Sequence, residues 1–228
     1  MNDVPRCFAL VPCAGAGQRA GTTGPKQYAM LGGRPVVAHT LAALAAVPRI
    51  VQTMVVLAPD DELFTHHVPR FAGRSVRCGG ATRAVTVANG LRALREEGVA
   101  EADWVLVHDA ARCLLQPAWV ERLIDACLDD DVGGLLALPL ADTLKQEANG
   151  RVALTVPRAD KWAAQTPQMF RLGLLERALR AAGPGVTDEA SAVEALGFAP
   201  RLVPGELENL KLTWPADFAL AARLLETR

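Results

Sequence analysis

The strongest local signal in the chain is residues 8–19, which read FALVPCAGAGQR and are followed by GPKQ at residues 24–27. An apolar run that opens into small residues is typical of a buried strand that ends in a loop. Small residues let the backbone approach a ligand, and successive amides in such a loop bind anions. Arg19 and Lys26 add positive charge beside it. We therefore expect a strand followed by a phosphate-binding loop.

Two familiar nucleotide-binding loops do not fit this segment. The dinucleotide fingerprint G-x-G-x-x-G opens a helix, whereas Gly15 and Gly17 are followed by QRA at residues 18–20. The P-loop requires G-x-x-x-x-G-K-[ST], which the sequence lacks. The structural alternative is a plain strand-to-loop turn that carries two solvated cations.

Apolar runs and amphipathic stretches alternate along the chain. Strands are expected at residues 8–11, 54–58, 76–78, 104–107 and 133–138. Helices are expected at 36–47, 82–97 with Thr82 as N-cap, after Pro117, and at 172–182, 188–196 and 216–226. This alternation is typical of an α/β fold in which helices cover both faces of a parallel sheet. We expect a Rossmann-like, mostly parallel twisted sheet flanked by helices.

Residues 139–160 interrupt this alternation. Asn149-Gly150 lies between two stretches with some alternation of polar and apolar residues, which indicates a tight β-hairpin. A hairpin inserted into a parallel domain has little core of its own. It needs another surface, either its own domain or a partner subunit. We expect a single domain over residues 1–228 that carries this hairpin as a projecting β-arm.

Composition excludes several classes of protein. Half of the 228 residues are apolar and the net charge is −1, without a basic block, which disfavours a nucleic-acid binder. The sequence has no apolar run of about 18 residues, so no membrane span or membrane partner is expected. The five cysteines have no C-x-x-C spacing and indicate a reducing cytoplasm, rather than disulfides or a zinc site. The short N-terminal apolar stretch is interpreted as a strand and not as a signal peptide.

A second signal, VHDAAR at residues 107–112, directly follows an expected buried strand. Ligands of α/β sheets bind at the carboxyl ends of the strands. A carboxylate there, Asp109, is suited to hold Mg²⁺ against phosphate oxygens, and Arg112 to pair with a phosphate. The alternative is that Asp109 caps the next segment and Arg112 lies on the surface.

The remaining signals are weaker. GGATRAVT at residues 79–86 places paired glycines where backbone groups can contact a base or ribose; the alternative is an ordinary loop before a capped helix. Arg158, Lys145 and Lys211 are cations that, taken singly, are typical of solvated charges. TDEAS at residues 187–191 foremost indicates a helix start with acids in its first turn.

Taken in order, these segments carry a resemblance. They are PCAGAGQR, GPKQY, GGATR, HDAAR, ADTLK, TVPR, QTPQMF, TDEAS and NLKLT. The chain resembles the 2-C-methyl-D-erythritol 4-phosphate cytidylyltransferases of the non-mevalonate isoprenoid pathway, from Ala9 to about Leu225. The specificity comes from the order, since no single segment is decisive. The resemblance implies a nucleotide-diphospho-sugar transferase type of fold, CTP and a small phosphorylated polyol as substrates, Mg²⁺ or another divalent cation, and a homodimer formed through residues 139–160.

The resemblance also implies residue roles, carried here to the matching positions. Catalytic residues are expected to be Arg19, Lys26, Arg158 and Lys211. The nucleotide is expected to contact Pro12, Cys13, Ala14, Gly15, Gly17, Gly80, Ala81, Thr86, Asp109 and Ala110. The phosphorylated alcohol is expected to contact Arg112, Thr143 and Thr166. Asp109 is the expected metal ligand.

The chain departs from the family pattern at four positions. Ala81 stands where the family often has Asp, so a side-chain contact to the nucleotide is lost there. Thr86 keeps the hydroxyl of the usual Ser, while Cys113 and Trp214 stand where Pro and Arg are common. None of these changes removes a residue from the expected chemistry. Two alternatives remain open: a cytidylyltransferase for a pentitol phosphate such as ribitol 5-phosphate, and a nucleotide-binding module without catalytic activity.

Overall fold

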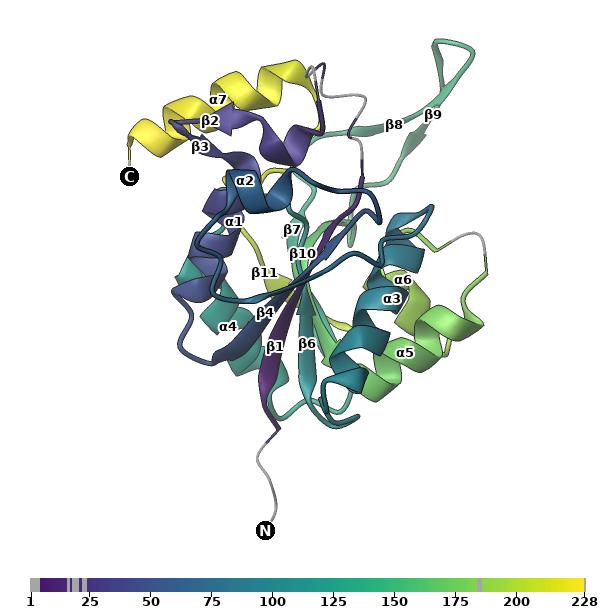
Figure 1. The fold of residues 1–228 in the computed structure, drawn as a ribbon. Helices are drawn as coiled ribbons and strands as arrows, with labels where there is room; N and C mark the ends of the chain where they lie inside the picture. The colour runs from purple at the N-terminus through teal and green to yellow at the C-terminus, as the bar shows by residue number, and fades with distance from the viewer. Residues whose placement is uncertain (1–4, 16, 18–20, 22–23, 184–185, 228) are drawn as a thin grey trace.

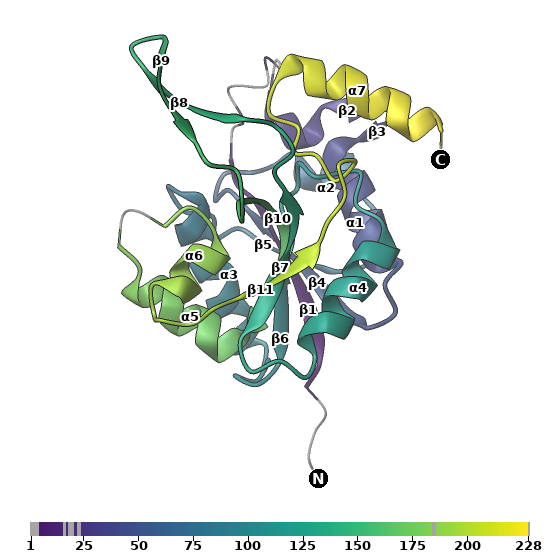
Figure 2. The same ribbon diagram turned by 180° about the vertical axis from the view of Figure 1, so that it is seen from behind.

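The computed structural model describes residues 5–15, 17, 21, 24–183 and 186–227. Within these residues seven strands form one mixed sheet in the order β11-β7-β10-β6-β1-β4-β5 (Figures 1 and 2). Its strands are β1 (Cys7–Cys13), β4 (Ile50–Leu57), β5 (Arg74–Val76), β6 (Trp104–Val107), β7 (Gly133–Pro139), β10 (Trp162–Arg171) and β11 (Arg201–Pro204). The expected α/β architecture is confirmed.

Helices cover both faces of this sheet, as expected. One face carries α1 (Val36–Ala45) and α4 (Pro117–Cys127); the other carries α3 (Arg83–Glu96), α5 (Leu172–Ala181) and α6 (Glu189–Glu194). The central strand β1 serves both cores by strict alternation, since Ala9 and Val11 pack on one side while Phe8 and Leu10 pack on the other. The short helix α2 (Phe64–His67) lies in the connection between β4 and β5.

The sheet is less parallel than the strand–helix alternation indicates. The strand β10 pairs antiparallel with both β6 and β7, whereas the other pairs in the sheet are parallel. Neither β10 nor the edge strand β11 is evident from the sequence. The segment QTPQ at residues 165–168 has the polar composition of a loop, yet Gln165 and Gln168 are buried and hydrogen-bonded.

Element boundaries also shift. The helix expected at residues 36–47 ends at Ala45, the strand expected at 54–58 begins at Ile50, and the strand expected at 76–78 is residues 74–76. Thr82 is the N-cap of α3, as expected, and its hydroxyl oxygen accepts a hydrogen bond from the N–H of Val85 at 3.2 Å.

The chain order places a switch point at β1. The chain passes from β1 to β4 and β5 on one side, and then returns through α3 to β6 on the other side. Loops that leave neighbouring strands in opposite directions open a crevice at the carboxyl ends, where α/β proteins bind ligands. A third apolar cluster closes this end, where α7 (Pro215–Glu226) packs with the small hairpin of β2 (Met30–Leu31) and β3 (Arg34–Pro35).

The β-arm forms as expected. Strands β8 (Leu144–Ala148) and β9 (Arg151–Val156) pair antiparallel around Asn149-Gly150, both of which have positive φ, 54° and 74°. This is the backbone that an Asn-Gly hairpin turn requires. The arm projects away from the sheet in both views (Figures 1 and 2). No helix in the described part of the chain is long and apolar enough to cross a membrane.

Candidate active site

A cavity of about 360 Å³ lies at the switch point, between the loops that follow β1 and β6 and the N-terminal end of α3. It brings together every residue expected to contact the nucleotide: Pro12, Cys13, Ala14, Gly15, Gly17, Gly80, Ala81, Thr86, Asp109 and Ala110. Lys26 and Lys211 line the same cavity. Residues from opposite ends of the sequence thus meet at one site, which is what the expected roles require.

The two glycine-bearing loops of the cavity touch each other. The N–H of Gly79 donates to the carbonyl of Leu57 at 2.8 Å, and a Cβ on Gly79 would lie 2.3 Å from the Cβ of Ala14. Only glycine permits this approach. The Thr86 hydroxyl then fixes the loop, because it accepts from the N–H of Gly80 at 3.1 Å and donates to the carbonyl of Thr82 at 2.9 Å.

Lys26 is held from the opposite wall of the cavity. Its Nζ donates to the carbonyl of Leu212 at 2.8 Å, and the neighbouring Gln27 donates through Nε2 to the carbonyl of Cys13 at 3.2 Å. These contacts tie the 3₁₀ turn at Lys26–Tyr28 to the end of β1 and to the segment before α7, residues 209–213, called the C-terminal segment below. The ammonium of Lys26 is therefore placed beside the glycine loop.

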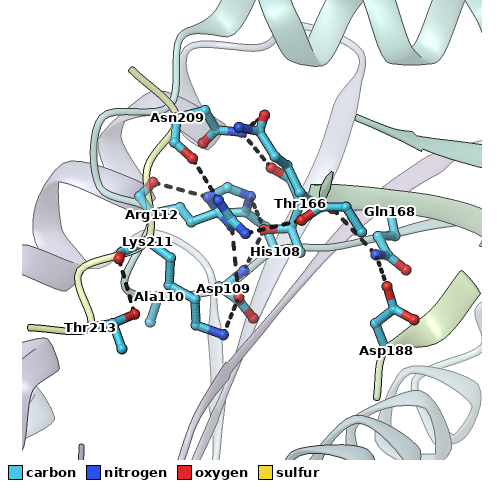
Figure 3. A network of polar contacts seen from close by, with 12 residues as sticks. His108, Asp109, Ala110, Arg112, Thr166, Gln168, Asp188, Asn209, Lys211 and Thr213 are labelled. Carbon is cyan, nitrogen blue, oxygen red and sulfur yellow. Dashed lines mark hydrogen bonds and ion pairs between the residues drawn. The ribbon is translucent and has the colours of Figure 1, made fainter. Parts of the chain in front are cut away.

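Asp109, directly after β6, is surrounded by positive charge. Its Oδ1 lies 2.8 Å from Nε of Arg83, and its Oδ2 lies 2.8 Å from Nζ of Lys211 and 3.8 Å from Nε of Arg112. Burial alone would raise the pKa of Asp109, but the charges of Arg83 and Lys211 outweigh it and hold the pKa well below its usual value. Asp109 is thus ionised, and cationic side chains lie beside both of its oxygens. Figure 3 shows Lys211 extending toward this carboxylate.

Thr166 and His108 form a buried layer next to Asp109 (Figure 3). The hydroxyl of Thr166 accepts from the N–H of Asp109 at 3.1 Å and lies 3.0 Å from Nδ1 of His108, to which it donates. Nε2 of His108 then donates to the carbonyl of Arg112 at 3.2 Å. Burial lowers the pKa of His108 to about 4, so this imidazole is neutral. Thr166, expected to contact the alcohol, is buried and does not line the cavity.

Arg112 is not a surface residue, and that alternative is wrong. Its side chain is 12% exposed and donates to the carbonyls of Asn209 at 2.6 Å and Ala164 at 3.4 Å. Its guanidinium therefore joins the C-terminal segment to β10 behind the cavity. Contact with the phosphorylated alcohol stays a prediction.

Arg83 and Glu189 are site residues that the sequence patterns do not single out. Arg83 lines the cavity and pairs with Asp109 on one side and Glu189 on the other, at 2.7 Å from Nη1 to Oε1. Glu189 opens α6 next to Asp188, whose side chain caps that helix as the structural interpretation of TDEAS expects. Both residues lie within quoted segments, GGATR and TDEAS, but their pairing spans 106 positions and leaves no local signal.

The other expected site residues lie elsewhere. Thr143 and Arg158 are exposed at the base of the arm, and neither lines the cavity. Lys145 donates to the hydroxyl of Thr155 within the arm. Arg19 lies outside the described residues. The residues expected on the nucleotide side thus line one cavity within the chain, whereas the expected arm residues do not line it.

The donor set fits Mg²⁺ bound together with a nucleotide. Among the described residues there is no group of three or more His, Cys, Asp or Glu side chains that forms a metal cage. Mg²⁺ is usually bound through one or two carboxylates plus substrate phosphates. Asp109 supplies one ionised carboxylate in the cavity wall, and CTP would supply the phosphate oxygens.

Comparisons with known proteins all indicate the same family. A family model described as 2-C-methyl-D-erythritol 4-phosphate cytidylyltransferase matches residues 7–227. An enzyme of that name from Laribacter hongkongensis is 56% identical over 224 residues, which cover 96% of each chain. A protein of Albidiferax ferrireducens named bifunctional enzyme IspD/IspF is 63% identical over all 228 residues, and the chain spans 54% of that relative's length.

Solved structures agree. A crystal structure of 4-diphosphocytidyl-2C-methyl-D-erythritol synthase superimposes with a TM-score of 0.87 at 43% identity and covers 97% of this chain and 98% of its own. The 2-C-methyl-D-erythritol 4-phosphate cytidylyltransferase of Thermus thermophilus gives 0.80 at 32% identity and covers 97% and 99%. Sequence, fold and cavity therefore lead to one conclusion: the chain belongs to the 2-C-methyl-D-erythritol 4-phosphate cytidylyltransferase family, and it is a nucleotidyltransferase.

Proposed function

We propose that this chain performs its family's reaction in the cavity at the switch point. It transfers the cytidylyl group of CTP to 2-C-methyl-D-erythritol 4-phosphate, giving 4-diphosphocytidyl-2-C-methyl-D-erythritol and pyrophosphate in the non-mevalonate route to isoprenoids. The observation that supports the proposal is that Lys26, Asp109 and Lys211 line one cavity together with the loop after β1 that contains Gly15 and Gly17, called the glycine loop.

The chemistry requires charge and alignment more than proton transfer. An oxygen of the substrate's phosphate attacks the α-phosphorus of CTP, and the bond from that phosphorus to the bridging oxygen of pyrophosphate breaks. The attacking phosphate is already anionic near neutral pH, so no strong general base is needed. Lys26 and Lys211 meet the negative charge that grows on the phosphate oxygens, and preorganised charges of this kind usually supply much of the rate. Arg19, which follows Gly17 closely in the sequence, is proposed to act with Lys26.

Each wall of the cavity has a proposed role. The glycine loop and the backbone around Gly80 hold the nucleotide, and Asp109 is proposed to hold the divalent cation. Bound there, Mg²⁺ would neutralise triphosphate charge and orient the phosphates for in-line attack. Because Ala81 has no polar side chain, any nucleotide contact at this position comes from the backbone.

The alcohol side of the site is proposed to involve the arm. Thr143 and Arg158 are exposed on it, while Val152 and Leu154 remain 63% and 47% exposed two positions apart on β9. The pairing with β8 shifts register between Val152 and Leu154, so simple alternation does not hold here, but the arm itself covers neither side chain. We propose that the arm packs on a second subunit through these apolar side chains, in a C₂ dimer whose arms bring Arg158 and Thr143 to the neighbouring cavity.

The proposed compartment is the cytoplasm. Cys7, Cys13, Cys78, Cys113 and Cys127 are all free thiols in the structure. Free thiols throughout a chain are typical of proteins in reducing compartments, which supports this assignment.

Pyrophosphate release from CTP tests the reaction directly. The enzyme is assayed with Mg²⁺ and, separately, 2-C-methyl-D-erythritol 4-phosphate, ribitol 5-phosphate or erythritol 4-phosphate, with release followed by a coupled phosphate assay. We expect the highest kcat/KM with the methylerythritol phosphate. A higher value with ribitol 5-phosphate would reassign the substrate, and no release with any of them would favour a nucleotide-binding module.

A further inference from the structure

The two carboxylate oxygens of Asp109 are held by cations of different kinds. Arg83 contacts Oδ1 through Nε at 2.8 Å, and Lys211 contacts Oδ2 through Nζ at 2.8 Å. A divalent cation at either oxygen would lie close to one of these positive charges, so binding is favoured when that charge moves away. Which of these two cations moves decides which carboxylate oxygen would be available to a metal ion.

Arg83 is fixed by a second carboxylate. Its Nη1 and Nη2 donate to Oε1 and Oε2 of Glu189 at 2.7 and 3.0 Å, in the paired geometry that suits a guanidinium fork. The Glu189 side chain is only 1% exposed. If Arg83 swung away, Glu189 would be left as a buried charge without its partner, which is strongly unfavourable.

Lys211 has more freedom. Its side chain is 38% exposed, and its ammonium is a compact charge at the end of a flexible stem. It also lines the cavity in which the triphosphate is proposed to lie. Lys211 can therefore leave Oδ2 and remain close to the nucleotide, whereas Arg83 cannot leave Oδ1 without disrupting a second ion pair.

Glu189 itself does not line the cavity. It sits in the first turn of α6, where the Asp188 cap and a hydrogen bond of 2.7 Å from the N–H of Ala190 to Oε1 of Gln168 anchor the backbone to β10. The Glu189 side chain reaches the cavity wall through its contacts with Arg83.

We infer that Glu189 is a positioning residue: through Arg83 it fixes Oδ1 of Asp109, so that Oδ2 is the oxygen that exchanges Lys211 for the divalent cation. The inference rests on the proposed function, since it takes Asp109 as the metal ligand. Without the charge of Glu189, the fork of Arg83 is free to turn onto both oxygens of Asp109. Arg83 then competes with the metal ion for the carboxylate.

The test measures cation binding without turnover. Electron paramagnetic resonance titrations follow Mn²⁺ binding to the enzyme with CTP present and the alcohol phosphate absent. Glu189→Gln should weaken Mn²⁺ binding about tenfold or more, as is usual when the partner of a metal ligand is lost. In steady-state assays the Mg²⁺ concentration for half-maximal rate should rise by a similar factor, and Glu189→Asp should recover part of the loss.

A matched control removes the same charge elsewhere. Glu176→Gln breaks an ion pair of 2.6 Å with Arg95, in which the glutamate side chain is 13% exposed, on α5 and outside the cavity. It should leave Mn²⁺ affinity unchanged. If Glu189→Gln does not fold, Arg83→Lys provides the second test. Lysine keeps the charge but lacks the planar fork that pairs with Glu189 through two N–H groups while Nε contacts Asp109, so it should show the same loss.

The possible results separate the inference from the proposed function. Normal Mn²⁺ affinity in folded Glu189→Gln, or in Arg83→Lys, together with weakened affinity in Asp109→Asn, would overturn the positioning role and leave the metal role intact. Normal affinity in Asp109→Asn as well would overturn the metal role itself. When both singles weaken binding, the double variant should be no worse than either, because the two residues act through one contact.

Discussion

The nucleotide cavity and the β-arm are built in opposite ways. In the cavity, loops from distant parts of the chain are fixed by hydrogen bonds such as Lys26 to Leu212 and Thr166 to Asp109. In the arm, β8 and β9 pair with each other while their apolar residues stay exposed. An isolated two-stranded hairpin is at best marginally stable in water. Under the proposed roles, one chain preassembles the CTP side of the site, whereas the alcohol side is completed by whatever the arm contacts.

The strongest test of this difference is to replace one lysine in each region and compare the effects on kcat. Lys26→Ala should lower kcat by about 10²–10³, or ~3–4 kcal/mol, because a preorganised charge at the transition state is lost. Lys145→Ala on the arm removes an exposed lysine bonded to Thr155 and should leave kcat within about twofold, since surface substitutions have small effects. Steady-state kinetics on both, with circular dichroism to verify folding, provide the measurement. Near-normal turnover in Lys26→Ala would exclude that lysine from transition-state stabilisation.

A mixing experiment tests whether the arm serves a neighbouring cavity. Arg158→Ala should be nearly inactive alone, as should Lys26→Ala. If Arg158 acts across a dimer, each heterodimer contains one site with both lesions and one site with neither. Random mixing then restores roughly a quarter of all sites, given free subunit exchange. Pyrophosphate release after mixing measures the recovery, and native mass spectrometry verifies that heterodimers have formed.

No recovery, with heterodimers present, would place Arg158 in its own chain's site. The arm would then be a local flap over the cavity of its own chain. The two regions would differ in how freely they move, and not in which subunit they serve. Mixing either variant with itself is the control, and it should restore nothing.

The two regions also differ in how much of them could be predicted from the sequence. The strands around β1 and the Asn149-Gly150 turn follow from local patterns, apolar runs and turn chemistry, and both are found. The strand β10 could not be predicted this way, because Gln165 and Gln168 are polar yet buried, and their partners Glu206 and Asp188 lie far along the chain. The cavity residues follow from the family resemblance, but the Arg83–Glu189 pair exists only through tertiary contact. Local patterns find elements; they do not find ion pairs between elements.

The buried layer next to Asp109 predicts a pH dependence of stability. Burial lowers the pKa of His108 to about 4, against an unperturbed value of about 6.5. In that window the unfolded chain binds a proton that the folded protein does not. The free energy of unfolding should therefore fall as the pH drops from about 6.5 to about 4, by up to about 3 kcal/mol from this group. Urea unfolding at several pH values measures it, and His108→Gln should flatten the dependence in that window. An unchanged slope in the variant would assign it to other groups.

The smallest predicted effect concerns the dimerisation constant, measured after one leucine is replaced in each region. Leu154 on the arm and Leu202 on the edge strand β11 are 47% and 46% exposed, so each offers similar apolar area to a partner. If the arm packs on a second subunit, Leu154→Ser should weaken dimerisation by about 1.5 kcal/mol, or roughly tenfold in Kd, because a C₂ dimer loses this leucine twice and each copy has only about half of its surface left to bury. Leu202→Ser should leave Kd unchanged, because β11 belongs to the body of the sheet. Sedimentation equilibrium over a dilution series measures both constants, and thermal unfolding at high protein concentration shows whether either change acts on the fold itself. Weaker association in Leu202→Ser and normal association in Leu154→Ser would move the subunit contact from the arm to the sheet edge. In that event the exposed Val152 and Leu154 of β9 would be left to contact the enzyme's own cavity, as part of a flap.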